Sequence, residues 1–305
     1  MSIQQDHEQW DIVTSVGFTA LLVAAGRAVE GHRDRPLVDD PWAARFVAAA
    51  EPPSTVPVTP DQRWNLDGVD QEVRGEVDTF WSMMTSYQGV RSRFFDTVLD
   101  RAVAAGVHQV VLLAAGLDAR AMRLAWGRPV TVFEIDQAAV LEFKDEVVGA
   151  HDGRATCDRR VVGVDLRDDW AAALRASGFD PTRPTAWLAE GLLPFLPAAA
   201  QEQLLRTVDE YSAPGSVIAA EHFDNALETM GRNRGMAALT APFGLEPTTL
   251  ASAEERTPAA RRLAELGWDV ATRPSRDVAR GYGRELGTMP DGTKFSSDLV
   301  TATKG

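Results

Sequence analysis

The sequence predicts an α/β fold, a doubly wound sheet of seven mostly parallel strands under a helical cap. Three observations lead to this prediction. One continuous apolar run without alternation, typical of a strand buried on both faces, is followed by further apolar runs along the 305 residues. Segments with helical spacing separate most of these runs, as in a parallel sheet with crossover helices. A glycine turn follows the first run and an acid ends the second, as in the first half of a nucleotide-binding βαβ unit.

That βαβ unit is the best defined part of the prediction. Its first strand is the apolar run at 110–115, and Gly116 follows where the chain must turn and a ligand must approach the backbone. The second strand, at 130–135, ends on Asp136. We expect Asp136 to accept hydrogen bonds from two ribose hydroxyls. The competing interpretation is that Asp136 only caps the next helix, expected over 138–148.

The residues of the turn favour one kind of nucleotide ligand. A dinucleotide site needs the pattern Gly-x-Gly-x-x-Gly so that a pyrophosphate can lie on a helix N-terminus. Here Ala114, Gly116 and Ala119 occupy those positions. Asp118, the expected N-cap of a helix over 119–126, adds a negative charge where phosphate oxygens would lie. S-adenosylmethionine carries an adenosine without phosphate, and therefore avoids this conflict.

The rest of the chain supplies the other elements in order. Apolar or helical periodicity predicts helices over 9–29, 78–84, 198–211 and 259–266, and a further helix that starts near residue 91. Pro41 suits the first turn of a short helix, and the four prolines of 51–60 indicate a linker. The remaining strands are expected at 159–166, 184–190, 215–223, 268–272 and 299–303. We divide the chain into an N-terminal helical cap, 1–88, and a core, 89–305, with a cap insertion at about 230–257.

Four short segments carry a resemblance to a known family. They are Leu113-Ala-Ala-Gly-Leu-Asp-Ala-Arg120, Phe133-Glu-Ile-Asp136, Val164-Asp-Leu-Arg167 and Ala189-Glu-Gly-Leu-Leu-Pro-Phe-Leu196. Together they resemble the leucine carboxyl methyltransferase-like family, and within it the actinobacterial branch of candidate S-adenosylmethionine-dependent methyltransferases. The likeness extends from about residue 10 to the end of the chain. It implies the Rossmann-like fold of class I methyltransferases, with S-adenosyl-L-methionine as cofactor.

The resemblance also implies cofactor-binding residues beyond Gly116 and Asp136. Arg91, with Arg93 as the second choice, would bind the carboxylate of the methionine moiety, for which a guanidinium offers a bidentate fork. Asp165 would accept a hydrogen bond from the adenine amino group, Leu166 would pack on the ring, and Glu190 would border the transferable methyl group. The alternatives are two solvated arginines, a helix cap at Asp165 and a structural acid at Glu190.

The implied reaction is methyl transfer to oxygen, on a carboxylate or a hydroxyl of a small molecule. A carboxylate acceptor needs no base, whereas a hydroxyl acceptor would call for one, and His222 at the end of a strand is the weak candidate. A lone histidine is more often structural. Two other functions remain open from the sequence, a nicotinamide-dependent oxidoreductase and a protein that binds the cofactor without turnover.

Composition narrows the partners and the compartment. The formal net charge of −13 disfavours nucleic acid and anionic membranes, and the apolar run near the N-terminus is too short to span a bilayer. Five scattered histidines and one cysteine, Cys157, predict no metal site. Cys157 cannot form an internal disulfide, which fits a cytoplasmic protein, and we expect it to be a partly buried thiol rather than a nucleophile. The sequence does not indicate an oligomeric state.

Overall fold

A seven-stranded sheet forms the centre of the computed structural model, which describes residues 16–223, 234–246, 256–288, 292 and 294–305. The strand order is β3-β2-β1-β4-β5-β7-β6, and the first five strands in that order pair in parallel. β7 lies antiparallel between β5 and β6. This arrangement confirms the predicted mostly parallel sheet. The strands are β1 (Gln109–Leu113), β2 (Thr131–Asp136), β3 (Asp158–Gly163), β4 (Thr185–Ala189), β5 (Val217–His222), β6 (Trp268–Pro274) and β7 (Asp298–Lys304).

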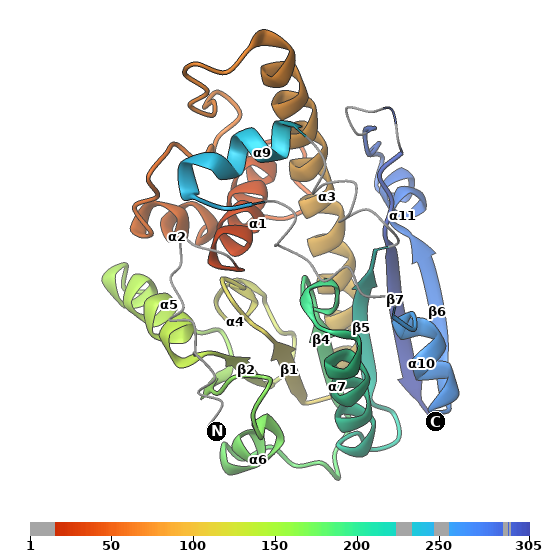
Figure 1. Cartoon of the computed structure of the whole chain (residues 1–305). Helices are drawn as coiled ribbons and strands as arrows, with labels where there is room; N and C mark the ends of the chain where they lie inside the picture. The colour runs from red at the N-terminus through yellow and green to blue at the C-terminus, as the bar shows by residue number, and fades with distance from the viewer. Residues whose placement is uncertain (1–15, 224–233, 247–255, 289–291, 293) are drawn as a thin grey trace, which may run out of the picture.

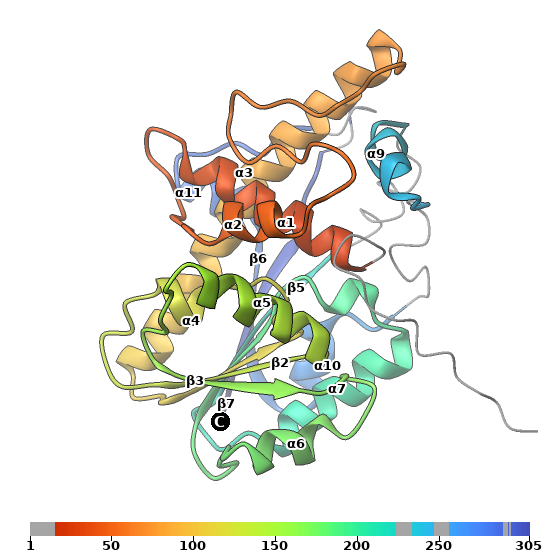
Figure 2. The same cartoon turned by 90° about the vertical axis from the view of Figure 1, so that its left-hand side faces the viewer.

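Helices cover both faces of the sheet (Figures 1 and 2). Alternate residues of a strand point to opposite faces, so Val110 and Leu112 of β1 enter one buried cluster and Val111 and Leu113 enter the other. The first cluster packs against α3 and α5, and the second against α6, α7 and α10. The helices are α1 (Val16–Gly31), α2 (Ala43–Ala49), α3 (Gln71–Ala104), α4 (Arg120–Arg123), α5 (Ala138–Ala150), α6 (Trp170–Ala176), α7 (Ala198–Glu210), α9 (Arg234–Thr240), α10 (Ala259–Glu265) and α11 (Ser275–Gly281).

The longest helix, α3, joins the cap region to the sheet. It begins after Asp70, whose Oδ1 accepts a hydrogen bond of 2.9 Å from the backbone amide of Val73 and so caps its N-terminus. It then continues for 34 residues to Ala104. We expected two helices here, and a division between residues 88 and 89 therefore falls inside one continuous helix.

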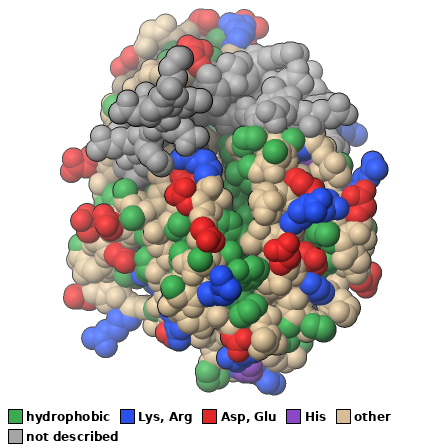
Figure 3. Space-filling model, turned by 60° about the horizontal axis from the view of Figure 1, so that its bottom comes forward, with side chains coloured by type: hydrophobic (Ala, Val, Ile, Leu, Met, Phe, Trp, Pro, Cys, Tyr) green, Lys and Arg blue, Asp and Glu red, His purple; other side chains and the backbone are tan. Residues whose placement is uncertain are grey.

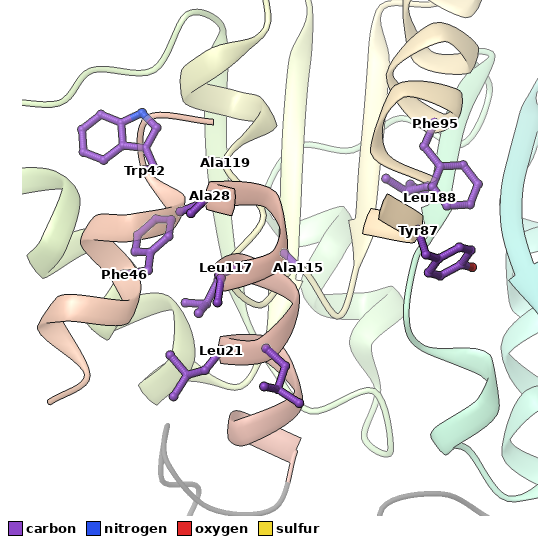
Figure 4. Close-up of a cluster of buried hydrophobic side chains, with 14 of the residues drawn as sticks. Leu21, Ala28, Trp42, Phe46, Tyr87, Phe95, Ala115, Leu117, Ala119 and Leu188 are labelled. Atoms are coloured by element: carbon purple, nitrogen blue, oxygen red, sulfur yellow. The ribbon is translucent and has the colours of Figure 1, made fainter. Parts of the chain in front are cut away.

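The helices α1 and α2 lie over the turn that follows β1. Leu21 and Ala28 of α1 and Phe46 of α2 belong to the same buried cluster as Leu117 of that turn (Figure 4). Leu117 is 3% exposed, so the N-terminal helices cover this part of the turn. The cap region therefore forms one wall of whatever site the turn builds.

Several expected elements differ in detail. The helix after the glycine turn is limited to the four residues of α4, and α2 begins two residues after Pro41. α11 occupies the connection between β6 and β7, where we expected a loop. Residues 234–243 of the expected cap insertion form α9 and a 3-10 turn, Ala241–Phe243. The start of the expected helix at 9–29 and part of the expected insertion lie outside the described residues. Among the described helices, none combines the length and the apolar character that a membrane crossing requires.

Candidate functional site

A cavity of about 230 Å³ opens where the carboxyl ends of β1, β2, β4 and β5 meet the helices α1, α3 and α9. In open α/β sheets this edge is the usual place for a ligand. The cavity brings together four of the predicted cofactor-binding residues, Arg91, Gly116, Asp136 and Glu190. Figure 3 shows one face of the molecule, on which acidic and basic side chains are interspersed as on an ordinary solvated surface.

Asp136 holds the glycine turn closed from the end of β2. Its Oδ2 accepts a hydrogen bond of 2.7 Å from the amide of Gly116, and its Oδ1 accepts one of 2.7 Å from the amide of Gln137. Gly116 has φ +45°, in the left-handed region that glycine adopts readily. Burial raises the pKa of Asp136, although the two backbone hydrogen bonds oppose this. The N-cap of α5 is Gln137, which makes no side-chain cap, so Asp136 fastens two backbone segments rather than only capping that helix.

Asp118 does not cap α4, which corrects our expectation. The helix starts only at Arg120, its N-cap is Ala119, and no side chain caps it. The turn before it has positive φ angles at Ala114 (51°) and Gly116 (45°). The Asp118 carboxylate instead accepts a hydrogen bond of 2.7 Å from the Arg120 amide and forms an ion pair with the Arg120 guanidinium. This pairing neutralises Asp118, which weakens the argument that its charge repels a pyrophosphate. The missing glycines remain as the stronger argument.

The pairing of Asp118 has a measurable consequence in acid. Burial alone would raise the pKa of Asp118, but the Arg120 guanidinium overrides this effect and lowers it to about 2. A carboxyl whose folded pKa is depressed stabilises the protein above its unfolded pKa and loses that contribution as the pH falls toward the folded pKa. We therefore expect Asp118→Asn to lower the unfolding free energy by about 2 kcal/mol at neutral pH, and the difference from wild type to vanish between about pH 4 and about pH 2. Urea unfolding of both proteins across this range checks it; a difference that did not change with pH would contradict the pairing.

A chain of buried ion pairs connects the turn to β4 and β5. Glu190 at the end of β4 bridges two arginines, with 2.8 Å to the Nε of Arg91 and 2.7 Å to the Nη1 of Arg120. Arg91 also binds Glu221 at 2.8 Å, and Arg120 binds Asp96 at 2.7 Å. Glu190 therefore lines the cavity, and it also has a structural role in holding both arginines in place.

Glu221 and Tyr87 are cavity residues that the sequence analysis missed. Glu221 is fully buried on β5 and accepts hydrogen bonds of 2.5 Å from both the Tyr87 hydroxyl and the Gly191 amide. Burial raises the pKa of Tyr87 well above its ordinary value, and the neighbouring charge of Glu221 adds to this shift. The sequence did carry a signal for Glu221, because it is an acid near the end of an apolar strand. The same signal identified Asp136 and Glu190.

The other predicted residues lie outside the cavity lining. Asp165 follows β3 by two residues, and Arg167 covers it with hydrogen bonds of 2.9 Å and 2.8 Å. These bonds lower the pKa of Asp165. The Nε2 of Gln137, the residue after Asp136, donates a hydrogen bond of 3.0 Å to the Asp165 carboxylate. Leu166 packs against the second buried cluster. The cap of the following helix is Asp169, whose side chain accepts a hydrogen bond from the Ala172 amide, so Asp165 does not have that role.

Two further candidates also lie apart from the cavity. Arg93 is exposed on α3, and His222 ends β5 opposite Asp298 of β7; neither lines the cavity among the described residues. Cys157 is partly buried, and burial raises the pKa of its thiol to about 12. A thiol with so high a pKa is a poor nucleophile at neutral pH, as we expected.

Sequence comparisons with known proteins match this chain to methyltransferases. The family model for leucine carboxyl methyltransferase matches residues 20–209. A candidate S-adenosyl-L-methionine-dependent methyltransferase of Saccharopolyspora erythraea is 46% identical over 298 residues, covering 98% of this chain and 99% of that protein. Another candidate S-adenosyl-L-methionine-dependent methyltransferase, from Rhodococcus jostii, is 42% identical over 292 residues, covering 95% of each.

A solved structure supports the fold. The crystal structure of a DUF574 family protein from Streptomyces avermitilis has a TM-score of 0.52 and 13% identity, and the match covers 93% of this chain and 97% of that one. At this level of identity the similarity concerns the arrangement of helices and strands alone. It agrees with the Rossmann-like sheet described above.

Proposed function

This chain belongs to the leucine carboxyl methyltransferase family, and on that premise we propose that it methylates a carboxylate oxygen of a small, largely apolar acid. It is an S-adenosyl-L-methionine-dependent methyltransferase. Family membership does not name the acceptor. The choice of acceptor rests on the side chains that line the cavity.

The cavity wall suits the cofactor. The Nη2 of Arg120 is a buried donor without a hydrogen-bond partner among the described residues, and the methionine carboxylate would satisfy it. We therefore add Arg120 to Arg91 as a proposed ligand of that carboxylate. We further propose that Asp136 binds the ribose beside Gly116, that Asp165 and Leu166 contact the adenine, and that Glu190 borders the methyl group. The cofactor supplies an activated methyl group on a sulfonium, and the chain's own residues position the acceptor and exclude water.

The absence of an available base in the described lining carries the proposal. The lining residues include no histidine, lysine or cysteine. Its carboxylates are occupied: arginines bind Asp118, Glu190 and Glu221, and two backbone amides bind Asp136. A hydroxyl acceptor would have to lose a proton to one of these groups. A carboxylate is already ionised at neutral pH and needs none, so it fits this wall better.

The charge balance of the lining points the same way. Four arginines and four carboxylates line the cavity, so the wall itself carries no net formal charge: they are Arg27, Arg91, Arg120 and Arg123, with Asp118, Asp136, Glu190 and Glu221. The cofactor brings a net positive charge with its sulfonium. An anionic acceptor restores neutrality, which matters in a buried site where charges are poorly screened.

Apolar side chains supply much of the rest of the lining. Phe80 and Met84 of α3, Phe223, Met236 of α9 and Phe295 contribute this surface. Burying an apolar group there is favourable by about 25 cal/mol per Å² of surface removed from water. The acceptor we propose is therefore an acid whose carbon skeleton contacts these residues.

A pH profile tests the absence of a base. We expect incubation with labelled cofactor and small carboxylic acids to give methyl esters that alkali hydrolyses, at a rate that is constant between about pH 6 and about pH 9, because no proton is lost in the step. Alkali-stable methyl ethers would contradict a carboxylate acceptor. A rate that falls on the acid side of neutrality in the wild type, but not in His222→Gln, would assign a base role to His222. Cofactor binding without turnover on any acid would favour a non-catalytic protein.

The cap region and the cellular location complete the proposal. We propose that α1, α2, the first half of α3 and α9 act together as the cap that encloses the acceptor, since α1, α3 and α9 contribute lining residues and α2 packs against α1. The single cysteine supports a cytoplasmic location.

A further inference from the structure

Three glutamines are buried among the described residues, and they differ in how well their amides are satisfied. Gln109 uses both amide atoms: its Nε2 donates to the Asp180 carbonyl at 2.9 Å, and its Oε1 accepts from the Asp180 amide at 3.0 Å. Gln201 donates to the Thr257 carbonyl at 2.7 Å. Gln88 is 1% exposed, and neither of its amide atoms has a hydrogen-bond partner in the described part of the chain. Of the three, Gln88 is the one that lines the cavity.

The position of Gln88 on α3 places it between the two kinds of cavity wall. Phe80, Met84, Gln88 and Arg91 follow one another at helical spacing and all line the cavity. These four side chains change from apolar at Phe80 and Met84 to polar at Gln88 and Arg91 along the helix. Gln88 lies about one turn, roughly 5 Å, before Arg91, which belongs to the ion-pair chain of the cofactor end. It lies one turn after Met84, at the apolar end.

A close approach of α1 fixes the side chain of Gln88. A methyl group placed on Gly26 would lie 2.7 Å from the Cγ of Gln88 and 3.3 Å from its Cβ, so only glycine leaves room for this side chain. The stem of Gln88 is therefore confined between the two helices before any ligand binds. Such confinement reduces the entropy lost when the amide forms a hydrogen bond with a ligand.

We propose that Gln88 recognises an uncharged hydrogen-bonding group, such as a hydroxyl or a keto oxygen, on the apolar skeleton of the methyl acceptor. A buried amide without partners is costly and such groups are rare in proteins, so one that lines a cavity indicates a missing partner, for which a ligand is a candidate. The amide offers one acceptor and two donors and carries no charge, which suits a neutral polar group rather than the reacting carboxylate. This inference rests on the proposed carboxylate methylation and adds a substituent to that acceptor: a hydroxylated or oxo-substituted apolar acid.

The melting temperature of Gln88→Leu tests whether the amide awaits a ligand. Leucine keeps most of the side-chain volume and removes the unpaired polar atoms, so we expect the protein without ligand to melt about 2 °C higher than wild type. The matched control is Gln109→Leu, which deletes satisfied hydrogen bonds and should melt about 4 °C lower. A Gln88→Leu variant that melted lower than wild type, or that failed to fold, would show that Gln88 is structural and would overturn the proposal.

Ligand binding tests what Gln88 recognises. Calorimetry on the protein saturated with S-adenosylhomocysteine uses the saturated acids from hexanoic to dodecanoic acid, each with its 2-hydroxy and 3-hydroxy derivatives. We expect wild type to bind at least one hydroxy acid about tenfold more tightly than the parent acid, and Gln88→Leu to lose this preference while it keeps its affinity for S-adenosylhomocysteine within about twofold.

The outcomes separate this inference from the proposed function. Equal binding of parent and hydroxy acids by wild type, or a preference that survives in Gln88→Leu, would overturn the role of Gln88 alone. A fall in S-adenosylhomocysteine affinity in Gln88→Leu would assign the amide to the cofactor and would also overturn it. Binding of none of the acids would contradict the proposed carboxylate acceptor, and with it the inference that rests on it.

Discussion

Arg120→Met is expected to lower the unfolding free energy by about 3–5 kcal/mol, the largest effect we expect from a single substitution in this chain. Arg120 is 2% exposed and pairs with Asp96, Asp118 and Glu190. Burial alone would lower the pKa of Arg120, but these carboxylates hold it well above its ordinary value. Methionine retains length and removes the charge. Three buried carboxylates would then share only the arginines that remain nearby, and an unpaired buried charge is costly.

Arg123→Met is the matched control for this prediction. Arg123 is half-buried on α4, and it forms an ion pair with Asp96, which would still have Arg120. We expect a loss of about 1–2 kcal/mol in this variant. Urea unfolding at neutral pH measures both losses. The double variant Arg120→Met with Asp118→Asn should recover part of the loss, because it removes one stranded carboxylate. Equal losses in the two single variants, or no recovery in the double variant, would show that the ion-pair chain is not the cause.

The parts of the fold that the sequence predicted are those in which neighbouring residues carry the signal. The apolar run of β1 and the run of β2 ending on Asp136 specify buried strands by themselves. The start of α3 was missed because its first turns, from Gln71 to Gly75, have Val73 as their one apolar side chain and include a glycine, so that periodicity appears only further along. Asp70, the residue that caps this start, lies among other acidic residues and does not stand out.

The parts of the site that the sequence did not predict depend on contacts between distant residues. Arg91 and Glu221 are 130 positions apart, and no spacing rule connects them. Arg120 was part of a motif, yet its three carboxylate partners come from α3, the glycine turn and β4. Asp118 was misplaced because a local cap and a side-chain ion pair look the same in sequence, and the helix starts only at Arg120. Gln88 carries no sequence signal; burial and an unsatisfied amide identify it only in three dimensions.

Asp136→Asn is the substitution from which we expect the largest loss of cofactor affinity. The Asp136 carboxylate accepts the amides of Gly116 and Gln137 with one hydrogen bond at each oxygen, and carboxylate oxygens have lone pairs left for further donors. We expect the ribose hydroxyls to use this remaining capacity. In Asp136→Asn, one acceptor oxygen becomes an amide nitrogen that faces a backbone N–H, so the turn loosens and a ribose contact is lost. The affinity for S-adenosylhomocysteine should then fall about 10-fold to 100-fold, equivalent to about 1–3 kcal/mol.

Asp169→Ala distinguishes a loss of cofactor contact from a general loss of stability. Asp169 also binds a backbone amide, that of Ala172, and caps α6, away from the cavity lining. Its removal should cost about 1 kcal/mol of unfolding free energy and leave the S-adenosylhomocysteine affinity unchanged in calorimetry. Asp136→Asn should lose both stability and affinity. If Asp136→Asn lost stability but bound S-adenosylhomocysteine as tightly as wild type, Asp136 would only fasten the turn, and the ribose would have to be held by other groups.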